Sequence, residues 1–322
     1  MKQADLGLNL TTKRTRKRAF LDEMSRMVPW SALVELVASH APVATTGRPP
    51  FALETVLCIH LMQQWFTLSD WAMEEALHDV PLLREFSGLD NWTTRLPDES
   101  TILRFHQLLE KHKLAAQILV IVNDLLRAKG LMLKAGAVVD ALFAAPSSTK
   151  NAGGESDPEK HQSKKGNQWH FGMEAHIGVD AESGLVQAGR GNSGNVKDAV
   201  EANALRHAEE TDAFGDAGYQ GTAKRPDAKV DMNWHIAMRP GRRIALDLSS
   251  PLAAMIDKVE QIKVSIRAKV EHPFQVIKRR FGHVKVRYRG LKKNITQPNT
   301  LFALANLWIA RKKLDILNRQ PA

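Results

Sequence analysis

The spacing of apolar residues changes along this chain of 322 residues at about residue 131. From about residue 19 to residue 129, apolar residues recur at every third or fourth position, which is the period of a helix face. Beyond residue 131, stretches of apolar and polar residues alternate, which is the period of a β-strand. The pattern therefore predicts an all-helical N-terminal domain over residues 19–130 and a mixed α/β domain over residues 131–322.

The second domain is expected to contain a mixed sheet of five strands. A short apolar strand around Asp140 comes first, and a polar loop from Pro146 to Asn167 follows it. Residues 169–179 then alternate as a half-buried strand, which turns back through residues 180–184 into an antiparallel hairpin. In this interpretation the polar face of the long strand, with His176 on it, is turned to solvent or to a bound partner.

The helical domain is large enough to hold a helix-turn-helix reader of DNA. The pair of helices over residues 52–66 and 69–79 has the right shape, but its second helix carries four acids that a phosphate backbone would repel. The helix that opens at Asp98 is the better base-reading candidate, because Arg104 lies early in it. Ser69 and Asp98 are both expected to be helix caps, and helix packing is the alternative role for most of these residues.

The net charge of +10 is concentrated in one segment, residues 263–293, which holds eleven Lys or Arg and a single acid, Glu271. Outside this segment, 34 basic and 34 acidic residues cancel. A pI near 9.7 with clustered charge indicates a polyanionic partner, nucleic acid before membrane. Residues 1–18, which end in five cations among six residues, are expected to form a flexible basic arm. The alternative for both segments is a solvated basic surface.

The cysteine and hydropathy patterns narrow the class of protein further. A single cysteine, Cys58, excludes an internal disulfide and any cysteine-based zinc site. No apolar run reaches the roughly eighteen residues of a membrane span. The N-terminus has basic residues with no apolar core after them, which argues against a signal peptide. The chain is therefore expected to be cytoplasmic, with no membrane partner.

Three carboxylates fall at positions where the fold would bring them together. Asp140 lies in an apolar strand, where an unpaired charge costs several kcal/mol, and Asp216 ends a later strand. Glu271 lies on a long helix expected from about Pro251 to Phe281. Three oxygen ligands suit Mg²⁺ or Mn²⁺, and two such ions about 4 Å apart would clamp a phosphodiester. The alternatives are a structural ion pair for Asp140, a turn for Asp216, and pairing with Arg267 for Glu271.

Several long segments surround these acids, among them VVDALFAAPSSTKN, FGDAGYQG and SIRAKVEHPFQVIKRRFG. These segments resemble DDE transposases of bacterial insertion sequences, and the insertion-sequence-five family of the insertion-sequence-four-like group is the close match. The resemblance implies an RNase H-like catalytic domain, a helical domain that recognises terminal inverted repeats, and Mg²⁺-dependent cleavage and transfer of DNA strands. It places the DDE triad on Asp140, Asp216 and Glu271 and the protein in the bacterial cytoplasm, associated with the nucleoid.

The resemblance also assigns residues that would contact DNA. The Tyr-Arg-Glu-Lys signature of the group falls on Val264, Arg267, Glu271 and Lys278, so a valine replaces its tyrosine. A homodimer or larger assembly is implied, because two terminal repeats and a target DNA must be joined. The alternative is a non-enzymatic DNA-binding descendant, which Val264, Glu174 and the glycine-rich residues 187–194 favour; a nuclease without strand transfer is a third reading. The expected DNA-binding residues are Arg267, Lys278, Arg279, Arg280, Lys164, Lys165 and Arg104.

Overall fold

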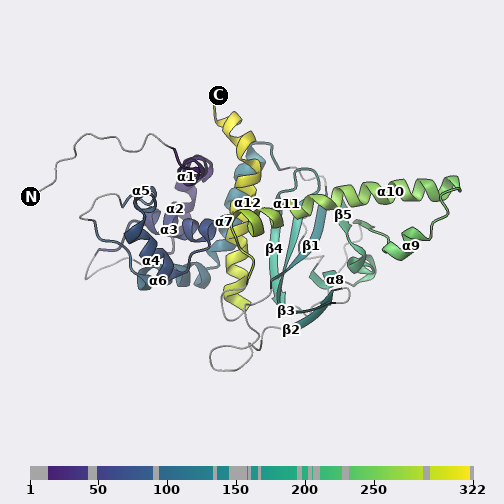
Figure 1. Ribbon diagram of the computed structural model, residues 1–322, viewed down its shortest axis with the longest axis horizontal. Coiled ribbons are helices and arrows are strands. Elements are labelled where there is room, and N and C mark those ends of the chain that lie inside the picture. Colours follow the sequence, from purple (N-terminus) through teal and green to yellow (C-terminus); the bar gives the residue numbers. More distant parts are fainter. Residues whose placement is uncertain are drawn as a thin grey trace, which may run out of the picture.

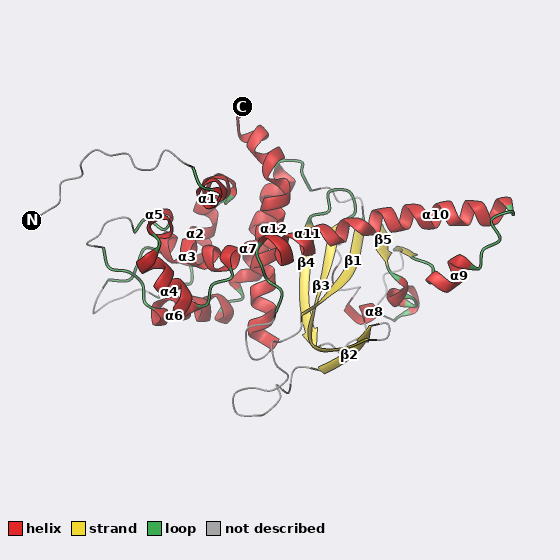
Figure 2. Ribbon diagram, in the orientation of Figure 1, coloured by secondary structure: helices red, strands yellow, loops and turns green. Residues whose placement is uncertain are grey.

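The structure is a computed structural model in which an N-terminal group of helices lies beside a mixed sheet (Figure 1). The chain is coloured along its length in Figure 1 and by secondary structure in Figure 2. The residues described by the structure are 14–42, 49–89, 94–132, 136–144, 158, 161–165, 168–193, 198–201, 205, 211–226, 232–285 and 291–319.

The first third of the chain is helical, as the spacing of its apolar residues predicts. The helices begin at polar caps where the sequence offers them, since Ser69 accepts a hydrogen bond from the Ala72 N–H and Asp98 from the Thr101 N–H. Both expected caps are confirmed. The helices are α1 (Arg16–Met27), α2 (Trp30–Ala38), α3 (Leu53–Phe66), α4 (Asp70–Asp79), α5 (Pro81–Phe86), α6 (Glu99–Lys111) and α7 (Leu114–Ala128).

The second part contains the mixed sheet. Strands β4, β3, β1, β5 and β6 lie side by side in that order; β1, β3 and β4 pair antiparallel, whereas β5 and β6 continue parallel to β1. The expected sheet of five mixed strands and its hairpin are confirmed. The bounds are β1 (Ala137–Ala144), β2 (His161–Lys165), β3 (Gln168–Asp180), β4 (Val186–Ser193), β5 (Asp212–Gly215) and β6 (Asn233–Ile236).

A sixth strand, β2, lies where the sequence predicts only a polar loop from Pro146 to Asn167. It pairs antiparallel with the first residues of β3, so that His161 lies opposite Gly172. The loop prediction is therefore wrong over these five residues. Lys164 and Lys165 are strand residues, and their polar composition hid the strand because no apolar alternation marks it.

Strand β3 is buried on both faces over residues 172–180, except at Ala175, so the prediction of a half-buried strand is wrong. His176, expected to be solvated, is fully buried, and Glu174 is buried too. Leu205 lies against the second face, at Gly178. A Cβ at Gly178 would lie 2.2 Å from the Leu205 carbonyl oxygen, so no larger residue fits there. The polar residues of the alternating pattern, Glu174 and His176, are therefore buried and not exposed.

Beyond β5 the chain forms small helical elements and then one long helical run. Pro273 has no N–H to donate to the Lys269 carbonyl, and the run has a tighter 3₁₀ turn at that carbonyl. The helix expected from Pro251 to Phe281 is confirmed. The elements are α8 (Asp198–Glu201), η2 (Ala217–Tyr219), η3 (Thr222–Lys224), α9 (Pro240–Ile244), α10 (Pro251–Arg267), η4 (Ala268–Val270), α11 (Glu271–Gln275) and the π-helical η5 (Val276–Arg280).

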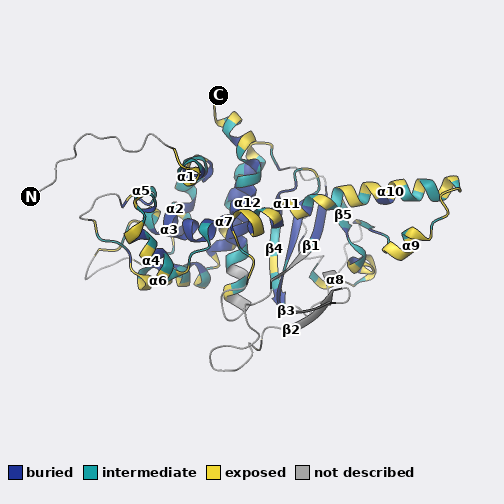
Figure 3. Ribbon diagram, viewed as in Figure 1, coloured by how far each residue is buried: buried dark blue, intermediate teal, exposed yellow. Residues whose placement is uncertain are grey.

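The last helix, α12 (Leu291–Arg319), lies between the helical part and the sheet and packs against α7, β4 and α1 (Figures 1 and 3). Its Asn306 is fully buried: the Oδ1 atom accepts the Val186 N–H, and the Nδ2 atom donates to the Asn123 side chain and to the Val186 carbonyl. One hydrophobic core runs from the helical part through α12 to the sheet. Among the described residues, no helix is long and apolar enough to cross a membrane.

Candidate active site

Asp140 and Asp216 are brought together by the pairing of two parallel strands. Val138 of β1 lies beside Phe214 of β5. Continuing the same register by two residues places Asp140 level with Asp216, which directly follows β5. Asp140 is opposite Ile177 of β3, and facing residues of an antiparallel pair project to the same side. The Asp140 side chain lies beside Arg267, the residue that precedes η4, and η4 packs against β1.

Asp216 has a local structural role as well as a place beside Asp140. Its Oδ1 atom accepts the Gly218 N–H at 2.7 Å, and the side chain thereby caps the short helix η2. The turn interpretation of Asp-Ala-Gly is therefore right, but it does not compete with a role in a site. The cap uses Oδ1, whereas Oδ2 is directed towards Arg267.

Arg267 joins the two aspartates. One guanidinium nitrogen, Nη2, lies 3.7 Å from Oδ2 of Asp140 and 3.7 Å from Oδ2 of Asp216. The two carboxylate oxygens are therefore no further apart than twice that distance. Asp140 is the less exposed of the two, with 15% of its side chain accessible against 35% for Asp216. Two close carboxylates repel each other, so the space between them favours a cation.

Glu271 lies four residues after Arg267 on the same helical run, which places its backbone roughly 6 to 8 Å further along the axis. It is exposed, while the preceding η4 turn packs against β1, the strand of Asp140. Over the described ranges, no three His, Cys, Asp or Glu side chains lie close enough to hold a metal ion. A site made from all three carboxylates therefore stays a prediction.

The basic residues of the long helical run have different neighbours. Lys263 donates to the Ile236 carbonyl of β6 at 3.3 Å as well as to Glu260 of its own helix, and Lys269 donates to the Ala181 and Glu182 carbonyls of the β3–β4 turn. Composition does not reveal that these two cations fix the helix to the fold. Along this run the exposure of the side chains differs, since Phe274 is buried whereas Val264, Glu271 and Lys278 are exposed.

The remaining expected DNA-binding residues fall into three groups. Lys278 and Arg279 are exposed, and within the described part of the chain no acid forms an ion pair with either. Arg280 instead lies over the Phe20 and Trp308 rings, with its guanidinium carbon 5.1 and 4.5 Å from the ring centres. Arg104 is exposed on α6, far along the chain from the sheet.

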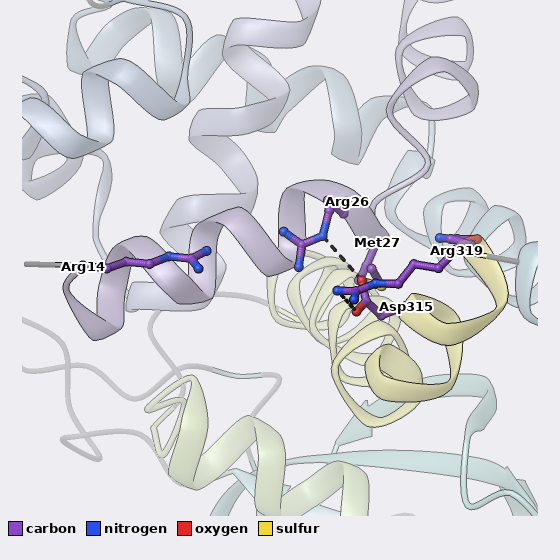
Figure 4. A pocket seen from close by; sticks show the side chains of 6 residues that line it. Arg14, Arg26, Met27, Asp315 and Arg319 are labelled. Atoms are coloured by element: carbon purple, nitrogen blue, oxygen red, sulfur yellow. Dashed lines mark ion pairs between the residues drawn. The ribbon is translucent and has the colours of Figure 1, made fainter.

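The structure describes residues 14–18 of the predicted basic arm. Part of this segment is helical, and some of its positive charges are paired with acids. Residues 16–18 form the first turn of α1, and Arg18 pairs with Glu85. A neighbouring surface pocket of about 540 Å³ lies between α1 and the end of α12, and Figure 4 shows side chains that line it. There Asp315 pairs with Arg26 and Arg319. Residues 1–13 lie outside the described residues.

Family models match both halves of the chain. The family described as Transposase domain (DUF772) matches residues 9–108, and the family described as Transposase DDE domain matches residues 137–307. The two descriptions define the class as transposase, a class of protein that acts in DNA transposition and belongs to mobile elements. Because the second match spans more than half of the chain, this protein belongs to the DDE transposase family. No solved structure matches the chain.

Membership of the family implies a DNA substrate, and DDE transposases generally use divalent metal ions. The match over residues 137–307 includes Asp140, Asp216 and Glu271. It also includes Glu174 and His176, a buried pair whose Oε2 and Nε2 atoms lie 3.8 Å apart. Sequence reasoning misses that pair, because alternation suggests an exposed face at both positions.

Proposed function

We propose that this protein is a transposase of the insertion-sequence-five family that binds the terminal inverted repeats of an insertion sequence and catalyses metal-dependent DNA strand cleavage and transfer. The observation that carries the proposal is the pair of carboxylates, Asp140 and Asp216, gathered around the Arg267 guanidinium. Two acids from different strands and a cation from a distant helix converge at one place. Packing alone gives no reason for that convergence.

The strand arrangement supports an RNase H-like catalytic domain. Three antiparallel strands, β4, β3 and β1, are followed across the sheet by β5 and β6, which run parallel to β1. Asp140 lies on the central strand and Asp216 follows its parallel neighbour. Residues 137–307 would form this domain together with the rest of residues 131–322, with the helices of residues 19–130 as the part that recognises DNA ends.

The residues of the site fit a hard divalent cation. Asp140, Asp216 and Glu271 would hold two Mg²⁺ or Mn²⁺ ions, because carboxylate oxygens are the ligands these ions prefer. Such ions activate the attacking oxygen and stabilise the leaving oxygen of a phosphodiester. The charge that Arg267 now places between the two aspartates supports this fit. Glu271 completes the set only if its side chain turns towards the sheet.

The cations of the chain then bind and orient DNA. A third of the Arg267 side chain is exposed, and this accessible part could contact a phosphate oxygen beside the site. Lys278 and Arg279 extend the basic surface along the same helical run. Arg104 on α6 would reach a terminal repeat, and Lys164 and Lys165 on β2 would reach the DNA backbone. Two such complexes, as a homodimer or larger assembly, would bring two ends to one target.

The second candidate is a non-enzymatic DNA-binding descendant of such a transposase. It is favoured by Glu271, which is exposed and not grouped with Asp140 and Asp216 in the described chain. In that case the contacts of Arg267 are structural ion pairs and the basic surface alone is functional. Both candidates bind DNA, so DNA binding does not separate them.

An end-cleavage assay separates them. We expect the wild-type protein to cut a labelled terminal-repeat duplex in Mg²⁺, and Asp140→Asn to lose cutting by orders of magnitude while keeping DNA binding. Asp212→Asn is the matched control, because Asp212 lies at the start of β5 and pairs with His235 at 2.7 Å. Equal cutting by wild type and Asp140→Asn would remove the assignment, and no cutting by either would favour the descendant.

A further inference from the structure

Helix α10 carries a stripe of exposed apolar side chains that the proposed active site does not use. Leu252, Met255, Val259 and Ile262 are between 46% and 69% exposed. Their spacing of three, four and three residues puts all four on one side of the helix. Four large apolar side chains in one line are more than the scattered exposure that a surface normally shows.

The opposite side of α10 is the one that holds the helix to the protein. Glu260 is buried there and accepts hydrogen bonds from the Met238 N–H and from Lys263. Asp257 pairs with Arg243 of α9 at 2.7 Å. The apolar stripe therefore faces away from the chain. Figure 1 shows α10 projecting beyond the sheet, on the side away from the N-terminal helices, and Figure 3 colours its residues mainly as exposed or intermediate.

The spacing of the stripe specifies what covers it. Alternating steps of three and four residues are the a and d positions of a heptad, which pack into a second helix with the same spacing. We propose that the partner is a second copy of this chain, bound through an antiparallel pair of α10 helices. The twofold axis would cross the apolar seam at the level of Asp257 along the helix. Leu252 then meets Ile262 of the partner subunit, and Met255 meets Val259 of the partner subunit. All four side chains are then used on both copies.

The position of the sheet favours the antiparallel arrangement over the parallel one. Charge does not separate the two, because Lys258 meets a lysine of the partner subunit in both: Lys263 of the partner subunit in a parallel pair, and Lys258 of the partner subunit in an antiparallel one. Lys263 is already paired with Glu260 at 2.7 Å. An antiparallel pair places the two sheets at opposite ends of the paired helices, because α10 begins at the end that projects beyond the sheet (Figure 1).

The size of the stripe predicts a weak pair. A helix of 17 residues is about 25 Å long, and one such seam buries less than the roughly 1,200 Å² of a standard stable complex. We expect a dissociation constant in the micromolar range, on the order of 10 µM. Resting on the proposed function, two copies held on linked DNA ends would pair more tightly, because the second contact becomes intramolecular.

The pairing also fixes the separation of the two candidate active sites. Arg267 lies ten residues from the twofold axis at Asp257, so the two Arg267 positions would lie about 30 Å apart along the paired helices. The apolar stripe and Arg267 lie on the same helix, so the position of the pairing along α10 determines the distance between the two sites. Dimerisation through α10 would set the distance between two strand-transfer points.

Sedimentation velocity of the full chain over a concentration series, without DNA, tests the pairing. We expect a monomer–dimer equilibrium in the wild type and a dissociation constant at least about a hundredfold higher for Val259→Glu, since the twofold axis introduces the charge twice. Val120→Glu is the matched control, at a valine of α7 that is 54% exposed, and it should behave as wild type. A wild type that stays monomeric well above 100 µM, or a dimer that Val259→Glu leaves intact, would overturn the proposal.

Disulfide cross-linking gives a second readout should Val259→Glu fail to fold. Cys58 is buried and its pKa is raised to about 12, chiefly by burial, so it stays out of the reaction. Lys258→Cys should cross-link to itself under mild oxidation, whereas Val264→Cys, on the other side of α10, should not. Equal cross-linking at both positions, or at neither, would overturn the pairing. A DNA-free dimer that cuts no DNA would contradict the proposed function alone, and cutting of paired ends by a monomer would contradict the pairing alone.

Discussion

Replacing Arg267 with glutamine should strengthen metal binding while it weakens DNA cleavage. In the folded protein one guanidinium nitrogen lies 3.7 Å from each of two carboxylate oxygens, on Asp140 and Asp216. A divalent cation that binds these oxygens must replace or repel that positive charge. Glutamine keeps most of the side-chain length and removes the charge, so the competition ends while the packing changes little.

The size of the effect follows from the distances and the exposure. Two charges at 3.7 Å interact by about 1 kcal/mol in water and by about 4 to 5 kcal/mol at an effective dielectric constant near 20. A third of the Arg267 side chain is exposed, so the value lies towards the aqueous limit. Removing two such contacts should favour the cation by about 1 to 3 kcal/mol, which corresponds to a roughly 5- to 150-fold lower dissociation constant.

This affinity can be measured directly by titrating the protein with Mn²⁺ at fixed ionic strength and recording the decrease of the paramagnetic resonance signal of free Mn²⁺. Lys263→Gln is the matched control, because it removes one charge from the same helix but from a lysine that is held by Glu260. We expect Lys263→Gln to bind Mn²⁺ as wild type does. An affinity that falls in Arg267→Gln, or that rises equally in both variants, would refute the reasoning, because Arg267 would then not compete for the cation site.

Three further predictions concern DNA binding, the core and pH. Lys278→Ala should reduce the slope of log K against log salt for DNA binding by about 0.9, and an unchanged slope would mean that Lys278 touches no phosphate. Asn306→Leu should lower the free energy of unfolding in urea by about 2 to 4 kcal/mol, since it leaves the buried Oδ1 atom of Asn123 and the Val186 N–H unpaired; a loss below 1 kcal/mol would contradict this. The pKa of His60 is lowered by burial and then by the neighbouring His106, so the folded state keeps His60 neutral while the unfolded state takes a proton below pH 6.5. Stability should therefore fall as pH drops below about 6.5, by up to about 1.4 kcal/mol per unit, and His60→Gln should flatten that fall; an equal fall in the variant would place the titrating group elsewhere.

The proximity of Asp140 and Asp216 could be predicted only with the family resemblance, because the residue pattern alone does not say which strands pair. An acid in an apolar strand and an acid at the end of a parallel neighbour meet whenever the two strands pair in register. The role of Arg267 could not be read in the same way. Its side chain is long, and whether it points to phosphate or to the aspartates depends on how the helix lies across the sheet.

The errors arise where the surroundings of a residue decide its exposure. Alternation marks Glu174 and His176 as a polar face, but both are buried and Leu205 lies against Gly178 on the same face; no local pattern reports such a distant contact. Arg280 counts as free basic charge in composition, yet it lies over Phe20 and Trp308. The family match supports DNA as the substrate, whereas the individual contacts of these cations with DNA are still predictions.

The measurement that tests the central claim most directly is anomalous diffraction at the manganese edge, from crystals grown with Mn²⁺ and a terminal-repeat duplex. We predict a peak within ligand distance of both Asp140 and Asp216, with the Glu271 carboxylate turned in to the same ions. A peak elsewhere, or a Glu271 carboxylate more than about 10 Å from the two aspartates in the loaded complex, would contradict the account, because such a distance is far beyond metal–oxygen bonding.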